Sequence, residues 1–232
     1  MYRYLVICAA LALGSVQAMA QTVGQRFTSS IQIGANSLPL PPGEWELVAQ
    51  SDQVIDNRGR GSLGDARHMV LVQTQGNTVS NIVHVRTNLR GGTGGWEQVT
   101  ECTRDDMLWR QSTVYTYEKD CQYVNHFVRF LQPSANQTGV MVDAAKELSA
   151  RNIQSAPTAI SNGVFLASRA FFLRLDVYRP SNFLAPSTHS PNWGESPWHR
   201  TRISPEMMAA VDAHRATMMS YLQQVRTAFG RW

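Results

Sequence analysis

The stretch CTRDDMLWRQSTVYTYEKDCQYVNHFVRFL, residues Cys102–Leu131, decides how the rest of the chain is interpreted. Trp109–Tyr117 alternates as a strand does, Glu118–Asp120 has the composition of a turn, and Cys121–Leu131 is rich in Tyr, Val and Phe. Period-two alternation and aromatic or β-branched residues are typical of strands. The pattern therefore predicts a β-hairpin, and its aromatic density favours a place at the centre of a sheet.

The first twenty residues have the pattern of a secretory signal peptide. Arg3 supplies a positive start, Leu5–Val16 is an apolar run too short to span a bilayer, and Ala18 and Ala20 are small residues at the positions that a signal peptidase reads. We therefore predict a signal peptide over residues 1–20, cleavage after Ala20, and a periplasmic or secreted protein. Cys8 would leave with the signal. No later stretch approaches the roughly 20 apolar residues of a membrane helix, so no transmembrane segment is expected after removal.

The two remaining cysteines, Cys102 and Cys121, are expected to form a disulfide. In an oxidising compartment an even number of cysteines pairs by default. A bridge that closes a loop of this size contributes about 3 kcal/mol in the chain-entropy model. The alternative, a redox-active or metal-binding pair, would favour CxxC spacing and nearby histidines.

Composition excludes two classes of ligand. The chain has 21 basic and 17 acidic residues without a basic run, so nucleic acid is not an expected partner. Gly59–Gly64 matches the GxGxxG pattern of dinucleotide sites, but His68–Val72 then has the composition of a strand, whereas such a site requires a helix. We therefore predict no cofactor.

The N-terminal half is expected to be mostly strands. Pro41–Trp45, PPGEW, leads into a strand that begins at Trp45, and Asp52–Arg67 has the composition of a Gly-rich, charged loop. His68–Gln75 and Thr78–Asn88 predict a second hairpin with its turn at Gly76–Asn77. In the return strand, Ile82, His84 and Arg86 share one face.

The C-terminal half adds helices. Val140–Asn152 has helical composition, and Phe171–Val177 alternates as a half-buried strand in which Arg174 and Asp176 share a face. Ser204 and Pro205 have the types preferred at a helix start, so a helix is predicted from there to about Phe229.

Strands first and helices later predict an α+β fold: a mostly antiparallel sheet built from hairpins and packed against a long C-terminal helix. Residues 21–232 are expected to form a single domain. Within it, residues 181–232 would be a Trp-containing loop plus the C-terminal helix.

Three segments carry a resemblance to other proteins: Leu38–Val48 with its PPGEW core, Cys102–Asp105, and Asp120–His126. They are similar to segments of uncharacterised exported proteins of proteobacteria. The resemblance implies a Gram-negative periplasmic setting. It implies no catalytic residue, because it brings no assigned activity with it.

The histidines allow a hydrolase as an alternative function. None of the six is spaced as HxH, HxxH or HxxxH, so a local zinc site is not expected, although His84 and His126 would meet if their strands paired. A hydrolase would use His126 or His84 as general base near Asp105 or Asp106. Ordinary histidines of a sheet are the other interpretation.

Soft-metal binding is the second alternative. Met207, His214 and Met218 recur at i, i+7 and i+11 on one helical face, and thioether plus imidazole suits Cu(I). Methionine is also a common core residue, and Val211 shares this face. The same choice applies to Asn192–Trp198, whose tryptophans would either stack on a ligand or fill the edge of the core.

With no convincing catalytic set, the sequence favours an exported, non-catalytic domain that binds an envelope protein partner or another surface component.

Overall fold

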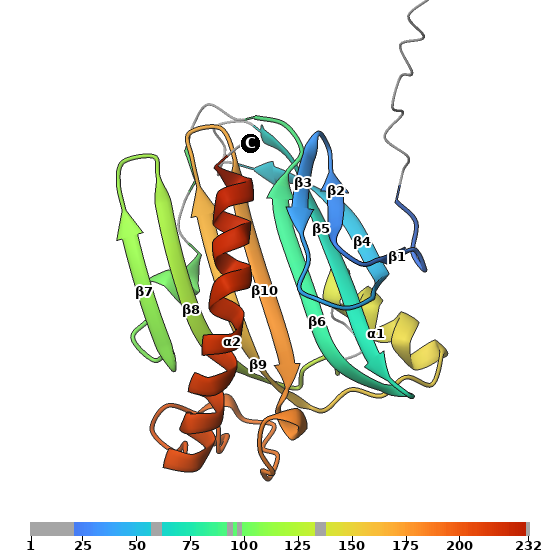
Figure 1. Cartoon of the computed structure of the whole chain (residues 1–232), viewed down its shortest axis with the longest axis vertical. Helices are drawn as coiled ribbons and strands as arrows, with labels where there is room; N and C mark the ends of the chain where they lie inside the picture. The colour runs from blue at the N-terminus through green and yellow to red at the C-terminus, as the bar shows by residue number, and fades with distance from the viewer. Residues whose placement is uncertain (1–20, 57–61, 92–94, 97–98, 133–137, 231–232) are drawn as a thin grey trace, which may run out of the picture.

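The computed structural model describes residues 21–56, 62–91, 95–96, 99–132 and 138–230 (Figure 1). The predicted signal peptide, residues 1–20, lies outside these residues. In the described part of the chain, the strands of the main sheet are β1 Arg26–Phe27, β4 Trp45–Asp56, β5 Ser62–Gln75, β6 Thr78–Asn88, β7 Trp109–Val114, β8 Lys119–Val128, β9 Thr158–Ala167 and β10 Phe172–Pro180. A small hairpin consists of β2 Ser30–Ile33 and β3 Asn36–Pro39. The helices are α1 Val140–Ala150 and α2 Pro205–Phe229, with short 3-10 turns η1 Thr100–Cys102, η2 Ser181–Phe183 and η3 Trp193–Glu195.

The strand order of the main sheet is β1-β4-β5-β6-β10-β9-β8-β7. The chain lays down β4, β5 and β6 as a meander, crosses to the far edge at β7, and returns through β8 and β9 until β10 pairs with β6. All of these pairings are antiparallel. The predicted α+β fold, a mostly antiparallel sheet with a long C-terminal helix packed on it, is confirmed.

Both predicted hairpins form, but one of them lies elsewhere in the sheet. β5 and β6 pair around Gly76, which has a φ of 59°. β7 and β8 pair around an earlier turn than predicted, where the Tyr115 amide donates to the Glu118 carbonyl at 2.8 Å. The predicted central position was wrong, because β7 is an edge strand. Tyr115 and Tyr117, which contributed to the aromatic density, are 67% and 45% exposed at the turn.

Helix α2 begins where the sequence predicts. The Ser204 side chain accepts a hydrogen bond from the Met207 amide at 3.2 Å, and Pro205 occupies the first helical position. Such a cap satisfies an amide that the helix itself leaves without a partner. Among the described residues, neither α1 nor α2 combines the length and apolarity that crossing a membrane would need.

Both faces of the main sheet are covered. Helix α2 and the β2–β3 hairpin pack on one face, the α2 face, and α1 packs on part of the opposite face, the α1 face (Figure 1). The α2 face is filled by apolar side chains that include Leu47, Leu71, Val85, Val164, Leu175 and Leu222. The α1 face carries two apolar clusters, one under α1 and one beside the disulfide. Polar side chains lie between these two clusters.

Two segments differ from the expectations. Most of the predicted Asp52–Arg67 loop is strand, since β4 continues to Asp56 and β5 begins at Ser62. Strand β9, which the alternation did not reveal, is buried at every position from Thr158 to Ala167. A strand that is covered on both faces does not alternate between polar and apolar residues, which removes the usual pattern.

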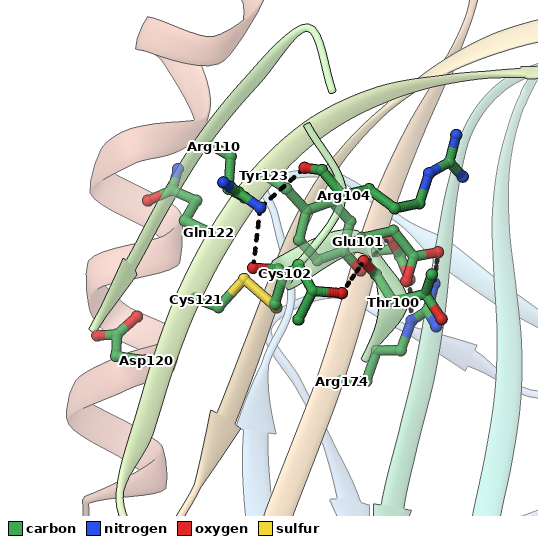
Figure 2. Close-up of a disulfide and its surroundings, with 12 residues drawn as sticks. Thr100, Glu101, Cys102, Arg104, Arg110, Asp120, Cys121, Gln122, Tyr123 and Arg174 are labelled. Atoms are coloured by element: carbon green, nitrogen blue, oxygen red, sulfur yellow. Dashed lines mark hydrogen bonds and ion pairs between the residues drawn. A yellow bond between two sulfur atoms is a disulfide. The ribbon is translucent and has the colours of Figure 1, made fainter. Parts of the chain in front are cut away.

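The predicted disulfide joins Cys102 of η1 to Cys121 of β8, with the two Cα atoms 5.9 Å apart (Figure 2). Both cysteines are buried beside Trp96 and Phe172. The bridge therefore fixes η1 on the α1 face of the sheet.

Removing the disulfide should lower stability without changing the fold. We expect Cys102→Ser plus Cys121→Ser to reduce the free energy of unfolding by about 3 kcal/mol, because the unfolded chain regains the entropy that the bridge removes. Urea unfolding of the variant, with reduced wild-type protein as the control, measures the loss. Equal stability of oxidised wild type and variant would contradict this role.

Candidate functional site

A group of polar side chains interrupts the apolar surface of the α1 face. We call it the central polar cluster; its members are Ser51, His68, His84, Arg86, Glu101, Tyr123, Arg174 and Asp176. Antiparallel register brings most of them together, because His68, Arg86 and Arg174 are opposite one another on β5, β6 and β10. His84 of β6 is opposite Asp176 in the next row. Residues opposite one another on one face have Cβ atoms about 5 Å apart.

The first half of the cluster is a hydrogen-bonded network around Asp176, whose side chain is fully buried. The Tyr123 hydroxyl donates to Asp176 Oδ1 at 2.9 Å, and Arg174 Nε donates to Asp176 Oδ2 at 2.9 Å. Arg174 Nη2 also donates to Glu101 Oε1 at 2.8 Å. Figure 2 shows Glu101 and Arg174 meeting beside the disulfide, so the bridge that fixes η1 also positions Glu101.

Burial and charge set the protonation of this network. Burial, and then the charge of Asp176, raises the pKa of Tyr123 well above its usual value, so the hydroxyl remains a donor. Burial lowers the pKa of Arg174, but the charge of Asp176, together with Tyr123, Tyr178 and Glu101, outweighs that effect, so the pKa lies above its usual value. A buried charge is tolerated when it is paired and hydrogen-bonded, as both oxygens of Asp176 are here.

Gly163 of β9 makes the network possible. It lies opposite both Asp176 and Tyr123 in the sheet. A Cβ atom at this position would be 2.2 Å from the Tyr123 ring and 2.7 Å from Asp176 Oδ1. The ring of Tyr123 therefore occupies the space that the side chain of any other residue at position 163 would fill.

The second half of the cluster lacks such partners. The rings of His68 and His84 lie 5.8 Å apart. Four buried atoms of this half of the cluster have no hydrogen-bond partner among the described residues: Ser51 Oγ, His68 Nε2, His84 Nε2 and Arg86 Nε. Buried polar atoms are nearly always paired in folded proteins, so four neighbouring exceptions need a specific explanation.

Arg86 is a charged side chain of the cluster that lacks an ion-pair partner among the described residues. Its guanidinium carbon lies 5.8 Å from the centre of the Phe172 ring. No described carboxylate forms an ion pair with it, whereas Arg174 pairs with both Asp176 and Glu101. Burial, followed by repulsion from Arg174, lowers the pKa of Arg86.

Both histidines of the cluster are neutral near pH 7. Burial, and then the charge of Arg174, lowers the pKa of His84 to about 3. Burial, and then the charge of Arg86, lowers the pKa of His68 to about 4. Each neutral ring carries one N–H donor and one acceptor nitrogen. With the Arg86 guanidinium and the Ser51 hydroxyl, the rings form a set of donors suited to an anionic group.

The candidate catalytic residues separate into two places. Strand β8 turns Tyr123 toward the α1 face, so His126, three residues later, lies on the α2 face. His84 and His126 therefore do not meet; His84 instead neighbours His68.

His126 has its own surroundings. Its ring stacks on Trp193 at 4.8 Å, and its Nε2 is 3.2 Å from the Trp193 carbonyl oxygen. Burial lowers the pKa of His126 to about 4. Arg104 covers the same tryptophan at 4.8 Å and pairs with Asp106 at 2.6 Å. Asp105, whose side chain is 94% exposed, pairs with Arg110 at 3.2 Å.

The candidate copper ligands lie in two clusters. Met207 packs beside Trp198 and Val211, whereas Met218 belongs to the core of the α2 face. His214 and Met218 line one cleft. In the described ranges, no group of three His, Cys, Asp or Glu side chains is placed to hold a metal ion. Of the two tryptophans in Asn192–Trp198, Trp198 is completely buried in the core and Trp193 is half-buried.

Most of the central polar cluster was not predicted from the sequence. The alternation placed His84 and Arg86 on one face of β6, and Arg174 and Asp176 on one face of β10. The alternation did not reveal the β6–β10 pairing, which brings these two pairs of side chains together on one face of the sheet.

The hydrogen bonds of the cluster leave several of its polar atoms without a partner among the described residues. In the residues described, neither His68 nor His84 hydrogen-bonds to a hydroxyl group that an imidazole base would activate. The Nε atom of Arg86 likewise has no partner in this part of the chain. No protein-family model matches the chain, and no curated protein and no solved structure matches it significantly.

Proposed function

We propose that this protein is an exported, non-catalytic domain of the cell envelope whose central polar cluster binds an anionic group of a surface component. The observation that carries the proposal is Arg86. Its charge is partly buried and has no carboxylate among the described residues, and its Nε, like His68 Nε2 and His84 Nε2 of the same cluster, is buried without a partner there. An anion in hydrogen-bond reach would satisfy these donors together.

The arrangement favours binding because it is held in place before a ligand arrives. Arg174 is fixed by Asp176 and Glu101, and Glu101 is fixed by the disulfide. Fixed donors lose little conformational entropy when they bind. The disulfide itself suits an oxidising compartment, which supports export through the predicted signal peptide.

Inorganic phosphate and acetate are the probes for this site. Each anion is titrated at pH 7 while the side-chain NMR resonances of His68 and His84 are monitored. We expect both resonances to shift, with a dissociation constant of about 1 mM. Arg86→Gln keeps the approximate shape of the side chain and removes its charge. We expect it to weaken binding at least about tenfold.

Arg90→Gln is the matched control, because Arg90 is exposed just beyond the end of β6. It removes the same charge from the chain but not from the cluster, so the titration should be unchanged. The proposal fails if neither histidine resonance responds to either anion, or if Arg86→Gln responds as wild type does.

A further inference from the structure

A cleft with a volume of about 510 Å³ lies between helix α2 and the sheet. Its walls come from residues 210–218 of α2, from Val177 and Arg179 of β10, and from residues 41–45 at the start of β4. We call it the α2 cleft. Val177 belongs to the core of the α2 face, so the cleft and the central polar cluster lie on opposite faces of the sheet. Its volume is in the range of small-molecule sites.

One part of the α2 cleft is apolar, whereas Gln73, Asn81 and Thr217 line the cleft with polar side chains. Val177, Ala213 and Met218 line it from two sides, and Pro41 and Pro42 line it from a third. Trp45 also lines the cleft, and its indole Nε1 donates to the Pro41 carbonyl at 2.7 Å. A ligand that fills this space would bury apolar surface, which favours binding.

Arg179 is the one charged side chain among the described residues that line the cleft. Its Nη1 donates to Asn81 Oδ1 at 2.9 Å, and its guanidinium carbon lies 5.0 Å from the centre of the Phe183 ring. These contacts hold the guanidinium plane from two sides. No ion pair of the described residues involves Arg179, so its charge is not neutralised by a carboxylate of the chain.

His214 of α2 adds an unused hydrogen-bonding atom. Its ring lines the cleft, and its Nε2 is buried without a partner in the described ranges. Burial, and then the charge of Arg179, lowers the pKa of His214 to about 4. The influence of Arg179 on this pKa is consistent with their shared position on the cleft wall.

We infer that the α2 cleft binds a small amphipathic carboxylate, with the carboxylate paired to Arg179 and hydrogen-bonded to His214, and the apolar body against Val177, Ala213 and Met218. A cleft with a single cation and no acidic side chain in its described lining selects a monoanion. The apolar lining selects a ligand with a hydrocarbon or aromatic body. This site is separate from the one of the proposed function and stands or falls independently of it.

Octanoate is the probe, and octan-1-ol is its neutral counterpart of the same chain length. The NMR resonance of the Trp45 indole N–H reports on the cleft, because this group bonds to Pro41 in the cleft wall. We expect octanoate to shift this resonance with a dissociation constant below about 1 mM, and octan-1-ol to bind about tenfold more weakly. Any shift of the His68 and His84 resonances would report carboxylate binding at the central polar cluster, as for acetate, and is measured separately from the Trp45 shift.

Two alanines of α2 provide a matched pair of variants. Ala213 lines the cleft and Ala209 does not, and both are exposed in the helix. Ala213→Leu should fill the cleft and reduce octanoate affinity about tenfold or more, whereas Ala209→Leu should leave it unchanged. Arg179→Met, which keeps a long side chain without charge, should remove the preference for octanoate over octan-1-ol.

Three results would overturn the inference. The first is an octanoate titration that leaves the Trp45 resonance unmoved. The second is equal octanoate affinity in Ala213→Leu and Ala209→Leu. The third is equal preference for octanoate over octan-1-ol in Arg179→Met and wild type, which tests the charge even if Ala213→Leu does not fold. Shifts of His68 and His84 in place of Trp45 would assign the carboxylate to the other face and likewise contradict the α2 cleft.

Discussion

Replacing Gly163 by alanine is expected to lower the free energy of unfolding by about 4 kcal/mol. The added Cβ would lie 2.2 Å from the ring of Tyr123, which is completely buried and has no free space to move into. Moving the ring would also break its 2.9 Å bond to Asp176 and leave a buried oxygen without that donor. Overpacking and a lost buried hydrogen bond each cost about 1–3 kcal/mol.

Gly194→Ala is the matched control for this variant. Gly194 has nothing within 4 Å of the position where a Cβ would be, so its substitution should change stability little. Urea unfolding at pH 7 measures both variants. A loss of less than about 1 kcal/mol in Gly163→Ala would show that the Tyr123 ring is not held where the structure places it.

Acid should destabilise the protein well above the pH at which carboxylates titrate. Burial lowers the pKa of His68, His126 and His214 to about 4, and that of His84 to about 3, from the usual value of 6.5. Between pH 6.5 and pH 4 the unfolded chain therefore binds more protons than the folded chain. The contribution of these neutral histidines to the free energy of unfolding is fully present above pH 6.5, and it is lost progressively as the pH decreases toward 4.

We expect the free energy of unfolding to decrease by about 4 kcal/mol between pH 7 and pH 4.5, a figure that allows for solvent screening of partly exposed rings. Arg86 and Arg174 raise the cost of charging His68 and His84, and Asp52 lowers it for His68. Urea unfolding at the two pH values measures the decrease.

His68→Gln plus His84→Gln should flatten this pH dependence, because the variant lacks two of the groups that take up protons on unfolding. His189→Gln is the control, because His189 is exposed. Equal stability of the wild type at pH 7 and pH 4.5 would rule out neutral, buried histidines.

Local sequence patterns predicted those elements that pack against segments adjacent to them in the chain. The hairpin of β5 and β6 needs only two alternating runs and Gly76, and the start of α2 needs only Ser204 and Pro205. Strand β9 lacked such a pattern because it is buried on both faces. The position of β7 and β8 was mispredicted because aromatic density reports burial, not strand order.

The candidate site shows the same limit. Period-two alternation placed His84 with Arg86, and Arg174 with Asp176, each pair on one strand. His84 and His126, which the sequence allowed to meet only if their strands paired, do not meet, because the two side chains are on opposite faces of the sheet. His68 became the neighbour of His84 instead, through the β5–β6 register.

The amino-acid sequence by itself determined the hairpins, the start of the C-terminal helix and the pair of cysteines that close the disulfide. These depend on turn residues, helix caps and the chemistry of two thiols. Only the tertiary structure decided the strand order, the burial of both sheet faces and therefore which polar side chains meet. The physical reason is that the β6–β10 pairing joins segments far apart in the chain, and it is stabilised by apolar surfaces that are buried only once all the strands are assembled.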